Sequence, residues 1–449
     1  MSKIEVNTVE PQCGTTLTLG GSGDTVTLGS GASQSGFGRT GTVDWQTTVK
    51  TTTFTAVNGE GYFVNTTSGA VTVNLPAGSV GAIVSIKDYA QTFDTANCTV
   101  SANGSEKIEN LTTDLILDTE GVAVTLVYAD ATRGWQAVNS NEVTNVVKFV
   151  TATGGTETIV CTNFKVHTFT GPGTFNVSCA GSPTGSTQVD YLVIGGGGSG
   201  GNAKDGLNGA AGGAGAGGYR ESGGTASGCY TVSPLGSSPS PVAAITVSAQ
   251  NYPITVGAGG ANRSTDGIGS AGSPSTFDSI TSAGGGAGGR GSAGPLLAGG
   301  SGGGSSCCGT AGAGNTPPVS PPQGNPGGNV HNPGTPTTTS AGGGGATAAG
   351  GNGAPGGPAG PGGAGATSSI NGTPTARAGG GGGGGNNGET GGGSGGSGGG
   401  GAGGNFPLNP GTAGTANTGG GGGASASGPG SATSGAGGSG IVIIRYKFQ

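Results

Sequence analysis

Short runs in which apolar and polar residues alternate recur through the first third of the chain. Between Phe54 and Val138 they include AVTVNL, AIVSIKD, CTVSA and VAVTLVYA, and pairs such as Asn-Gly, Ser-Gly and Arg-Gly separate them. Period-two alternation between turn residues predicts strands with one buried face, and no helical period interrupts the pattern. We therefore expect a β-sandwich-like or jelly-roll-like module over residues 42–142.

An earlier segment repeats the same alternation at shorter range. TLTLGGSGD (residues 16–24) is followed by TVTLGSGAS (residues 25–33), and each turns at glycine. One isolated hairpin is marginal in water, so these strands need partners from other copies of the chain. We expect residues 1–41 to form a β-stalk in which copies wind together, most simply as a homotrimer.

Two apolar strands bracket the second half of the chain. A second β module is expected over residues 143–194, and it ends in VDYLVI (residues 189–194); the chain itself ends in IVIIRYKF, within a closing strand at residues 441–449. Pairing of these two strands would satisfy both of their backbone edges. It would also bring together the two ends of the segment between them.

That segment, residues 195–440, is dominated by glycine. The whole chain has 111 Gly and 24 Pro but only 8% charged residues, whereas disordered segments are usually rich in charge. Disorder is the main alternative, because glycine loses the most backbone entropy on ordering. Runs such as GGGSGGSGGGG lack the glycine at every third position that collagen requires.

The ordered arrangement we expect for this tract is a polyglycine-II helical bundle. A strand of this kind has three residues per turn and no internal hydrogen bonds, so every N–H and C=O can pair with neighbouring strands. The predicted fold class is therefore all-β: a stalk and small sandwich-like modules, then a polyglycine-II bundle, in a homotrimeric fibre.

Charge and hydropathy exclude several partners. The net charge is −6 and no Lys/Arg cluster occurs, which argues against nucleic acid and anionic membranes. Residues 1–10 lack the apolar region of a secretion signal, and the longest aliphatic run, Ile441–Ile444, is too short to insert into a membrane. We expect synthesis in a cytoplasm and release by another route, such as lysis.

Catalytic groups are sparse. His167 lies in FKVHTFT, where a half-exposed strand position is expected, and His331 lies in a Pro/Gly loop without carboxylate or cysteine neighbours. Glu106 and Glu109 could suggest the paired acids of a glycan-cleaving enzyme, but solvated turn carboxylates are the preferred interpretation. Seven cysteines without CxxC spacing do not form a zinc motif. We predict no enzyme activity, no cofactor and no metal.

Binding needs less than catalysis, because loops on a rigid scaffold suffice when they carry aromatic, arginine and amide groups. The sparse large side chains of the tract are our candidates for contact with a receptor: Tyr219, Arg220, Tyr230, Arg263, Arg290, His331, Arg377 and Phe406. An equally weighted alternative is that Tyr219 and Phe406 cap the ends of the bundle.

Several of these stretches resemble tail-fibre proteins of marine bacteriophages, especially cyanophages. GTVDWQTT and GSGIVIIRY are the most specific, and SKIEVN, VDYLVIGGGG and YPITVGAGG are also typical of such fibres. The resemblance implies a homotrimeric virion protein that recognises the host surface. The C-terminal half is also similar to the tip adhesins of T-even-type phages, which are separate proteins, so no receptor-contacting residue is transferred from them.

The predicted function is attachment of a virion to a host cell. Its partners would be its own copies, other tail or capsid proteins through the N-terminus, and a host polysaccharide or outer-membrane protein. The alternatives are a capsid or head fibre without receptor binding, an ice-binding protein suggested by the TLTL and TVTL repeats, and a depolymerase.

Overall fold

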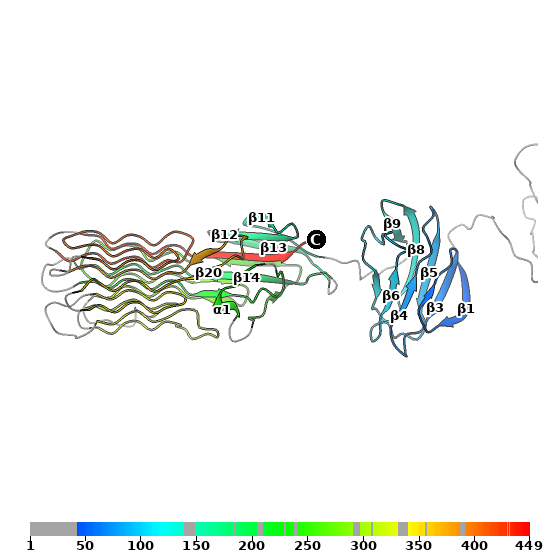
Figure 1. Cartoon of the computed structure of the whole chain (residues 1–449), viewed down its shortest axis with the longest axis horizontal. Helices are drawn as coiled ribbons and strands as arrows, with labels where there is room; N and C mark the ends of the chain where they lie inside the picture. The colour runs from blue at the N-terminus through cyan, green and yellow to red at the C-terminus, as the bar shows by residue number, and fades with distance from the viewer. Residues whose placement is uncertain are drawn as a thin grey trace, which may run out of the picture. The chain divides into compact units, whose positions relative to one another are not determined.

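A computed structural model shows two compact units, residues 1–144 and residues 145–449, each of which is described separately (Figure 1). The predicted β-stalk, residues 1–41, lies outside the described residues. The structure describes residues 43–138, 149–182, 185–203, 210–228, 230–237, 241–290, 297–306, 309–330, 340–354, 357–386, 391–428, 430 and 432–449.

The first unit consists of two sheets around one apolar core, as the alternating pattern predicts. The first sheet has the order β1-β3-β5-β8-β9 and the second β2-β4-β6-β7. Trp135, Phe93, Leu126 and Ile86 are fully buried between them. The strands are β1 (Asp44–Lys50), β2 (Phe54–Thr55), β3 (Glu60–Val64), β4 (Val71–Asn74), β5 (Ile83–Asp88), β6 (Cys98–Ser101), β7 (Leu115–Leu117), β8 (Ala123–Asp130) and β9 (Gly134–Ala137).

The connections of this unit differ from those of a jelly roll, whose neighbouring strands are antiparallel. From β1 to β6 the chain passes alternately into one sheet and then the other, so strands that neighbour each other within a sheet run the same way. The pairs β1/β3, β3/β5, β2/β4 and β4/β6 are all parallel.

The second unit places two larger sheets over a core that contains Phe175, Tyr191, Phe277 and Tyr446. The sheet orders are β10-β13-β17-β18-β19 and β11-β12-β22-β14-β15, with β16 on β14, while β20 and β21 form a separate hairpin. The elements are β10 (Val150–Thr153), β11 (Thr156–Val160), β12 (Phe164–Phe169), β13 (Gly173–Ala180), β14 (Gln188–Ile194), β15 (Tyr219–Glu221), α1 (Pro234–Ser237), β16 (Ile245–Thr246), β17 (Asn251–Thr255), β18 (Ser275–Phe277), β19 (Ile280–Ser282), β20 (Ala366–Ser368), β21 (Thr375–Arg377) and β22 (Ile441–Lys447).

The predicted pairing of the two bracketing strands is confirmed. Strands β14 and β22 are antiparallel neighbours, with Ile194 opposite Ile441 and Asp190 opposite Arg445. Both are almost wholly buried, which explains why they read as continuous apolar runs rather than as alternating ones. The predicted second β module and the glycine-rich tract also share sheets, because β17–β19 extend the sheet of β10 and β13.

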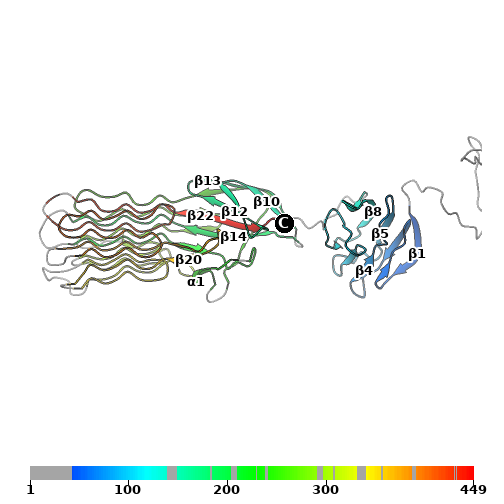
Figure 2. The same cartoon turned by 45° about the horizontal axis from the view of Figure 1, so that its top comes forward.

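Between the strands, extended glycine-rich segments run out from the sheets, turn, and run back, lying side by side (Figures 1 and 2). Their backbones bond sideways with a period of three. The N–H groups of Gly196, Gly197 and Gly198 donate to carbonyls of Ser273, Gly438 and Gly215, and the next three residues donate to the same three neighbouring segments. We call this array of residues 195–440 the glycine lattice.

The prediction of a polyglycine-II helical bundle is wrong, although the all-β part of the fold class fits. The described residues form mainly strands in several sheets, and α1, with four residues, is the one helix among them. The physical reason is that strands within the tract join the sheets, as β17, β18 and β19 extend the sheet of β10 and β13, so the glycine segments are built onto the sheets and do not form a separate helical bundle. No helix in the described part of the chain is long and apolar enough to cross a bilayer.

Substitution of a lattice glycine tests whether close backbone approach holds this unit together. A Cβ added at Gly197 would overlap the carbonyl of Gly420, whereas one added at Gly391 has its nearest neighbour, Cβ of Pro358, at 3.9 Å. Because overpacking typically costs about 1–3 kcal/mol, we expect Gly197→Ala to lower the melting temperature by several degrees and Gly391→Ala to leave it unchanged. Equal melting temperatures of Gly197→Ala and Gly391→Ala, measured by calorimetry, would contradict the close backbone packing around Gly197.

Candidate functional site

The predicted binding residues fall at two opposite ends of the glycine lattice. Tyr219, Arg220 and Arg377 belong to strands, and Tyr230 packs beside them; we call this the sheet end. Arg263 and Phe406 lie at bends and turns of lattice segments, at residues 264–266 and 406–408, and Arg290 pairs with Asp266 there; we call this the turn end. His331 lies outside the described residues.

A buried carboxylate organises the sheet end. Strand β15 has the sequence Tyr-Arg-Glu, so Tyr219 and Glu221 share its buried face while Arg220 faces the other way. The Glu221 carboxylate accepts hydrogen bonds from the Tyr219 hydroxyl (3.0 Å), the Ser233 N–H (3.0 Å) and the Ser368 hydroxyl. Burial raises the pKa of Glu221 above its ordinary value, and these hydrogen bonds oppose the shift. The cluster ties β15 to the β20–β21 hairpin.

Arg445 is a central residue of this end that the sequence reasoning missed. It is fully buried, and its guanidinium lies 4.7 Å from the ring centre of Phe164 and 4.9 Å from that of Tyr230. Its Nη1 donates to the Ile370 carbonyl (3.2 Å) and its Nη2 to the Gly228 carbonyl (3.3 Å). A cation held between two rings is a cation–π arrangement, so Arg445 anchors two loops on the closing strand.

Two of our candidates are buried at this end, and a third is half-buried. Tyr219 is 1% exposed, Arg377 is 5% exposed, and Tyr230 is half-buried under Arg445. Burial raises the pKa of Tyr219 well above 10 and lowers that of Arg377, as expected for groups removed from water. In this structure Tyr219 and Arg377 pack within the sheet end, and their side chains are removed from solvent.

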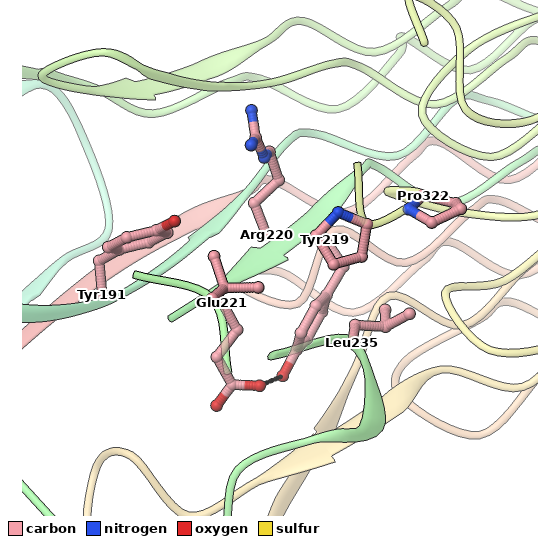
Figure 3. A pocket seen from close by; sticks show the side chains of 8 residues that line it. Tyr191, Tyr219, Arg220, Glu221, Leu235 and Pro322 are labelled. Carbon is pink, nitrogen blue, oxygen red and sulfur yellow. Dashed lines mark hydrogen bonds between the residues drawn. The ribbon is translucent and has the colours of Figure 1, made fainter. Parts of the chain in front are cut away.

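A small pocket opens beside the same cluster (Figure 3). Its volume of about 10 Å³ holds at most one water molecule, so it is far too small for a substrate. The side chain of Arg220 also lines this pocket. The lining residues are Tyr191, Tyr219, Arg220, Glu221, Leu235, Val242, Pro321 and Pro322.

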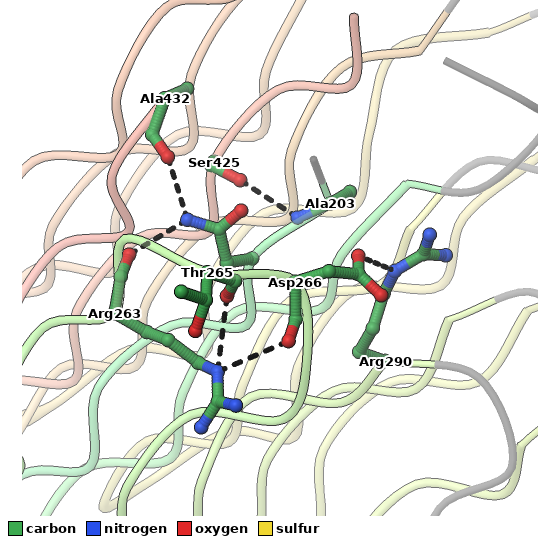
Figure 4. Close-up of polar contacts among 8 residues, drawn as sticks. Ala203, Arg263, Thr265, Asp266, Arg290, Ser425 and Ala432 are labelled. Carbon is green, nitrogen blue, oxygen red and sulfur yellow. Dashed lines mark hydrogen bonds and ion pairs between the residues drawn. The ribbon is translucent and has the colours of Figure 1, made fainter. Parts of the chain in front are cut away.

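At the turn end, hydrogen bonds fix segments from distant parts of the chain against one another (Figure 4). The Asn202 side-chain amide donates to the carbonyls of Arg263 (2.7 Å) and Ala432 (2.6 Å). The backbone of Arg263 also bonds to Ser434, donating to its hydroxyl and accepting from its N–H. Asn202 is fully buried, so this contact holds the register of three segments.

Two of the predicted arginines contact the same residue, Asp266, one through its carboxylate and the other through its backbone carbonyl. Arg290 pairs with Asp266 at 2.8 Å, and the two side chains are 16% and 44% exposed. The Nε of Arg263 donates to the carbonyls of Thr265 (3.0 Å) and Asp266 (3.3 Å) (Figure 4). Charged donors and acceptors fixed side by side can form hydrogen bonds with hydroxyl-rich or peptide ligands.

Phe406 lies in another turn and is half-buried. That turn is closed by a bond from the Asn409 N–H to the Asn405 carbonyl (3.2 Å), and the Leu408 N–H donates to Ser427 (3.3 Å). The partial burial of Phe406 fits a contact with a ligand, and it also fits the alternative in which Phe406 caps the end of the glycine-rich array.

No catalytic constellation appears among the described residues. The expectation of a half-exposed His167 is wrong: the ring is fully buried between the Gly154 carbonyl (2.7 Å) and the Tyr446 hydroxyl (3.0 Å). Glu106 is half-buried rather than solvated, and it accepts from the Gly78 N–H (2.9 Å) and the Trp135 indole (3.3 Å). Glu109 accepts from the Ala137 N–H. Within the described residues no His, Cys, Asp and Glu side chains cluster as metal ligands.

The buried imidazole generates a pH prediction. Burial lowers the pKa of His167 below 6.5, so the unfolded chain binds more protons at this site. The stability contribution is therefore complete above about pH 6.5 and is lost as the pH falls. We expect the melting temperature of the second unit to fall between pH 7 and pH 5, and His167→Gln to flatten that dependence.

His331→Gln removes the other histidine of the chain and is the matched control. It should preserve the pH dependence of the parent protein. Two results would contradict a neutral buried His167: a melting temperature of the parent protein that does not change between pH 7 and pH 5, or a change of equal size in His167→Gln.

The comparisons with known proteins address the second unit. No curated protein matches the chain. A glycine-rich domain family matches residues 170–447, more than half of the chain, and the matched region begins between β12 and β13 and ends at the last residue of β22. It thus takes in the glycine lattice together with both strands that close it. The chain belongs to this glycine-rich domain family.

Proposed function

We propose that the chain is a bacteriophage tail-fibre protein whose turn end attaches the virion to the host cell surface. One observation carries the proposal. Hydrogen bonds from Asn202 hold segments from three distant parts of the chain together, with Arg263, Asp266 and Arg290 beside them. The resemblance of GTVDWQTT and GSGIVIIRY to phage fibres supports the virion origin.

The scaffold suits recognition for an energetic reason. A loop that is already ordered loses little conformational entropy when it binds, so weak polar contacts can still give useful affinity. Residues 195–201 are buried, residues 432–440 are buried or half-buried, and both segments are hydrogen-bonded on several sides, which fixes their positions. Several copies on one virion would multiply weak contacts through avidity. The ligand would be a host polysaccharide or an outer-membrane protein loop.

Competition for adsorption tests the proposal. Purified chain should bind the bacterium that the virus infects and block adsorption of the virus. The double variant Arg263→Ala/Arg290→Ala should weaken the block at least fivefold, because it removes two partly exposed positive charges whose contacts with the ligand are worth about 1 kcal/mol or more together. Arg133→Ala, which changes an exposed arginine of the first unit, is the control.

Protein that neither binds cells nor competes would overturn the adhesive role. Immunogold labelling of virions then separates the alternatives: label on the tail fits a fibre, and label on the head fits a head fibre or decoration protein.

A second candidate, ice binding, is favoured by one feature. The outer face of the β10-β13-β17 sheet carries exposed small polar side chains in register, where Thr153 is opposite Asn176 and Asn176 is opposite Asn251. Regular hydroxyl and amide rows can order water. Measurement of thermal hysteresis decides this candidate, and a freezing point equal to the melting point removes it.

A further inference from the structure

An exposed row of aromatic side chains crosses the first unit, and nothing proposed above uses it. Trp45 is 42% exposed on β1, Phe63 is half-buried on β3, and Tyr89, directly after β5, is 57% exposed. Their rings are neighbours: the centroids of Trp45 and Phe63 are 5.0 Å apart and those of Phe63 and Tyr89 are 6.4 Å apart. We call these three residues the aromatic stripe.

The parallel register explains why the stripe is continuous. Trp45 pairs with Gly61 and Phe63 pairs with Lys87, so each ring lies two residues further along than the ring on the preceding strand. Residues two apart share a face of a sheet. The opposite face belongs to the core, where Tyr62, Val64 and Ile86 are buried. The stripe therefore lies on the outer face of the sheet.

The rings are also held in place before any ligand arrives. The Tyr89 N–H donates to the Val64 carbonyl (2.9 Å), which fixes Tyr89 beside β3. The buried Asp88 carboxylate accepts from the Gly121 and Phe93 N–H groups, at 3.0 and 3.3 Å. Trp45 lies over Gly61, where an added Cβ would come within 2.8 Å of its ring. A preorganised surface loses less entropy on binding.

Size and charge decide what such a surface can bind. The exposed parts of Trp45 and Tyr89 amount to roughly 200 Å² on a scale of about 150–250 Å² per aromatic side chain. That area is well below the ~800 Å² per partner that a stable protein interface needs, so a second copy of the chain is not its occupant. The charged side chain on the same face as Phe63 and Tyr89 is that of Lys87, which is half-buried and whose Nζ already donates to the Gly121 carbonyl. A charged ligand is therefore not favoured over a neutral one.

We propose that the aromatic stripe binds a neutral oligosaccharide. The face of a pyranose ring presents C–H groups of partial positive charge, which complement the negative faces of aromatic rings. Its hydroxyls need polar partners, and the side-chain hydroxyls of Thr47, exposed, and Thr125, half-buried, belong to the strands of the same sheet. The contacts would be stacking on Trp45 and Tyr89 with Phe63 between them.

Tryptophan fluorescence of the full chain provides a direct test. The chain has two tryptophans, and Trp135 is fully buried, so a ligand-induced change in emission reports on Trp45. The probes are cellohexaose, maltohexaose and mannohexaose, with hexagalacturonate as the charged comparison. We expect saturable quenching or a blue shift with at least one neutral probe and weaker binding of the charged one.

Variants connect binding to the stripe, with affinity measured by calorimetry. Tyr89→Ala and Gly61→Ala, which displaces the Trp45 ring, should each weaken binding at least fivefold, and Trp45→Ala should abolish it. Val80→Ala, which truncates a side chain 80% exposed outside the stripe, should have no effect. Melting temperatures of all variants establish that the unit is folded.

Three results would overturn the proposal. The first is no response to any neutral probe up to about 10 mM, a concentration that detects even weak affinity. The second is Trp45-dependent binding to phosphatidylcholine vesicles, which would assign the stripe to a lipid surface. The third is a change in sedimentation coefficient in Trp45→Ala, which would assign it to contacts between copies of the chain.

Discussion

Lateral backbone hydrogen bonding between glycine segments is the interaction on which the second unit depends. Each segment approaches its neighbours so closely that a Cβ at most lattice glycines would overlap a carbonyl of another segment. The entropy lost by ordering glycine is offset by hydrogen bonds made on three sides, by burial, and by the two strands that close the lattice. Large apolar side chains are correspondingly concentrated in the sheets at one end.

The closing contact between β14 and β22 converts this lattice into a unit with two chemically different ends. At the sheet end, Arg445 and Glu221 are buried, and their hydrogen bonds secure the loops against the strands. At the turn end, Asn202 joins segments that are far apart in sequence, while charged groups such as Asp266 stay partly exposed. The division follows from solvation, because a buried charge needs several partners and a turn residue can be solvated by water.

The first unit reaches stability by a different route, with two sheets enclosing an apolar core that contains Trp135 and Phe93. Its parallel winding has a consequence for its surface. The neighbouring strands β1, β3 and β5 run in the same direction. The aromatic residue of each strand lies two residues beyond the position that pairs with the preceding ring, so the rings form a row across the three strands. An antiparallel arrangement of the same strands would place these rings differently.

The sequence by itself determined the strands of the first unit and the pairing of the two bracketing strands. These features depend on local alternation, on apolar runs and on composition, which can be read without knowing the fold. The polyglycine-II helical bundle was predicted wrongly, because composition does not specify how extended glycine segments pair. Tyr219 and Arg377 could not be distinguished from Arg263 and Arg290 by sequence, since all four are large side chains in a tract composed mainly of small residues. Only the tertiary structure decided which of them are buried, because burial depends on contacts between residues far apart in the chain, such as Glu221 with Ser368 and Asn202 with Ala432.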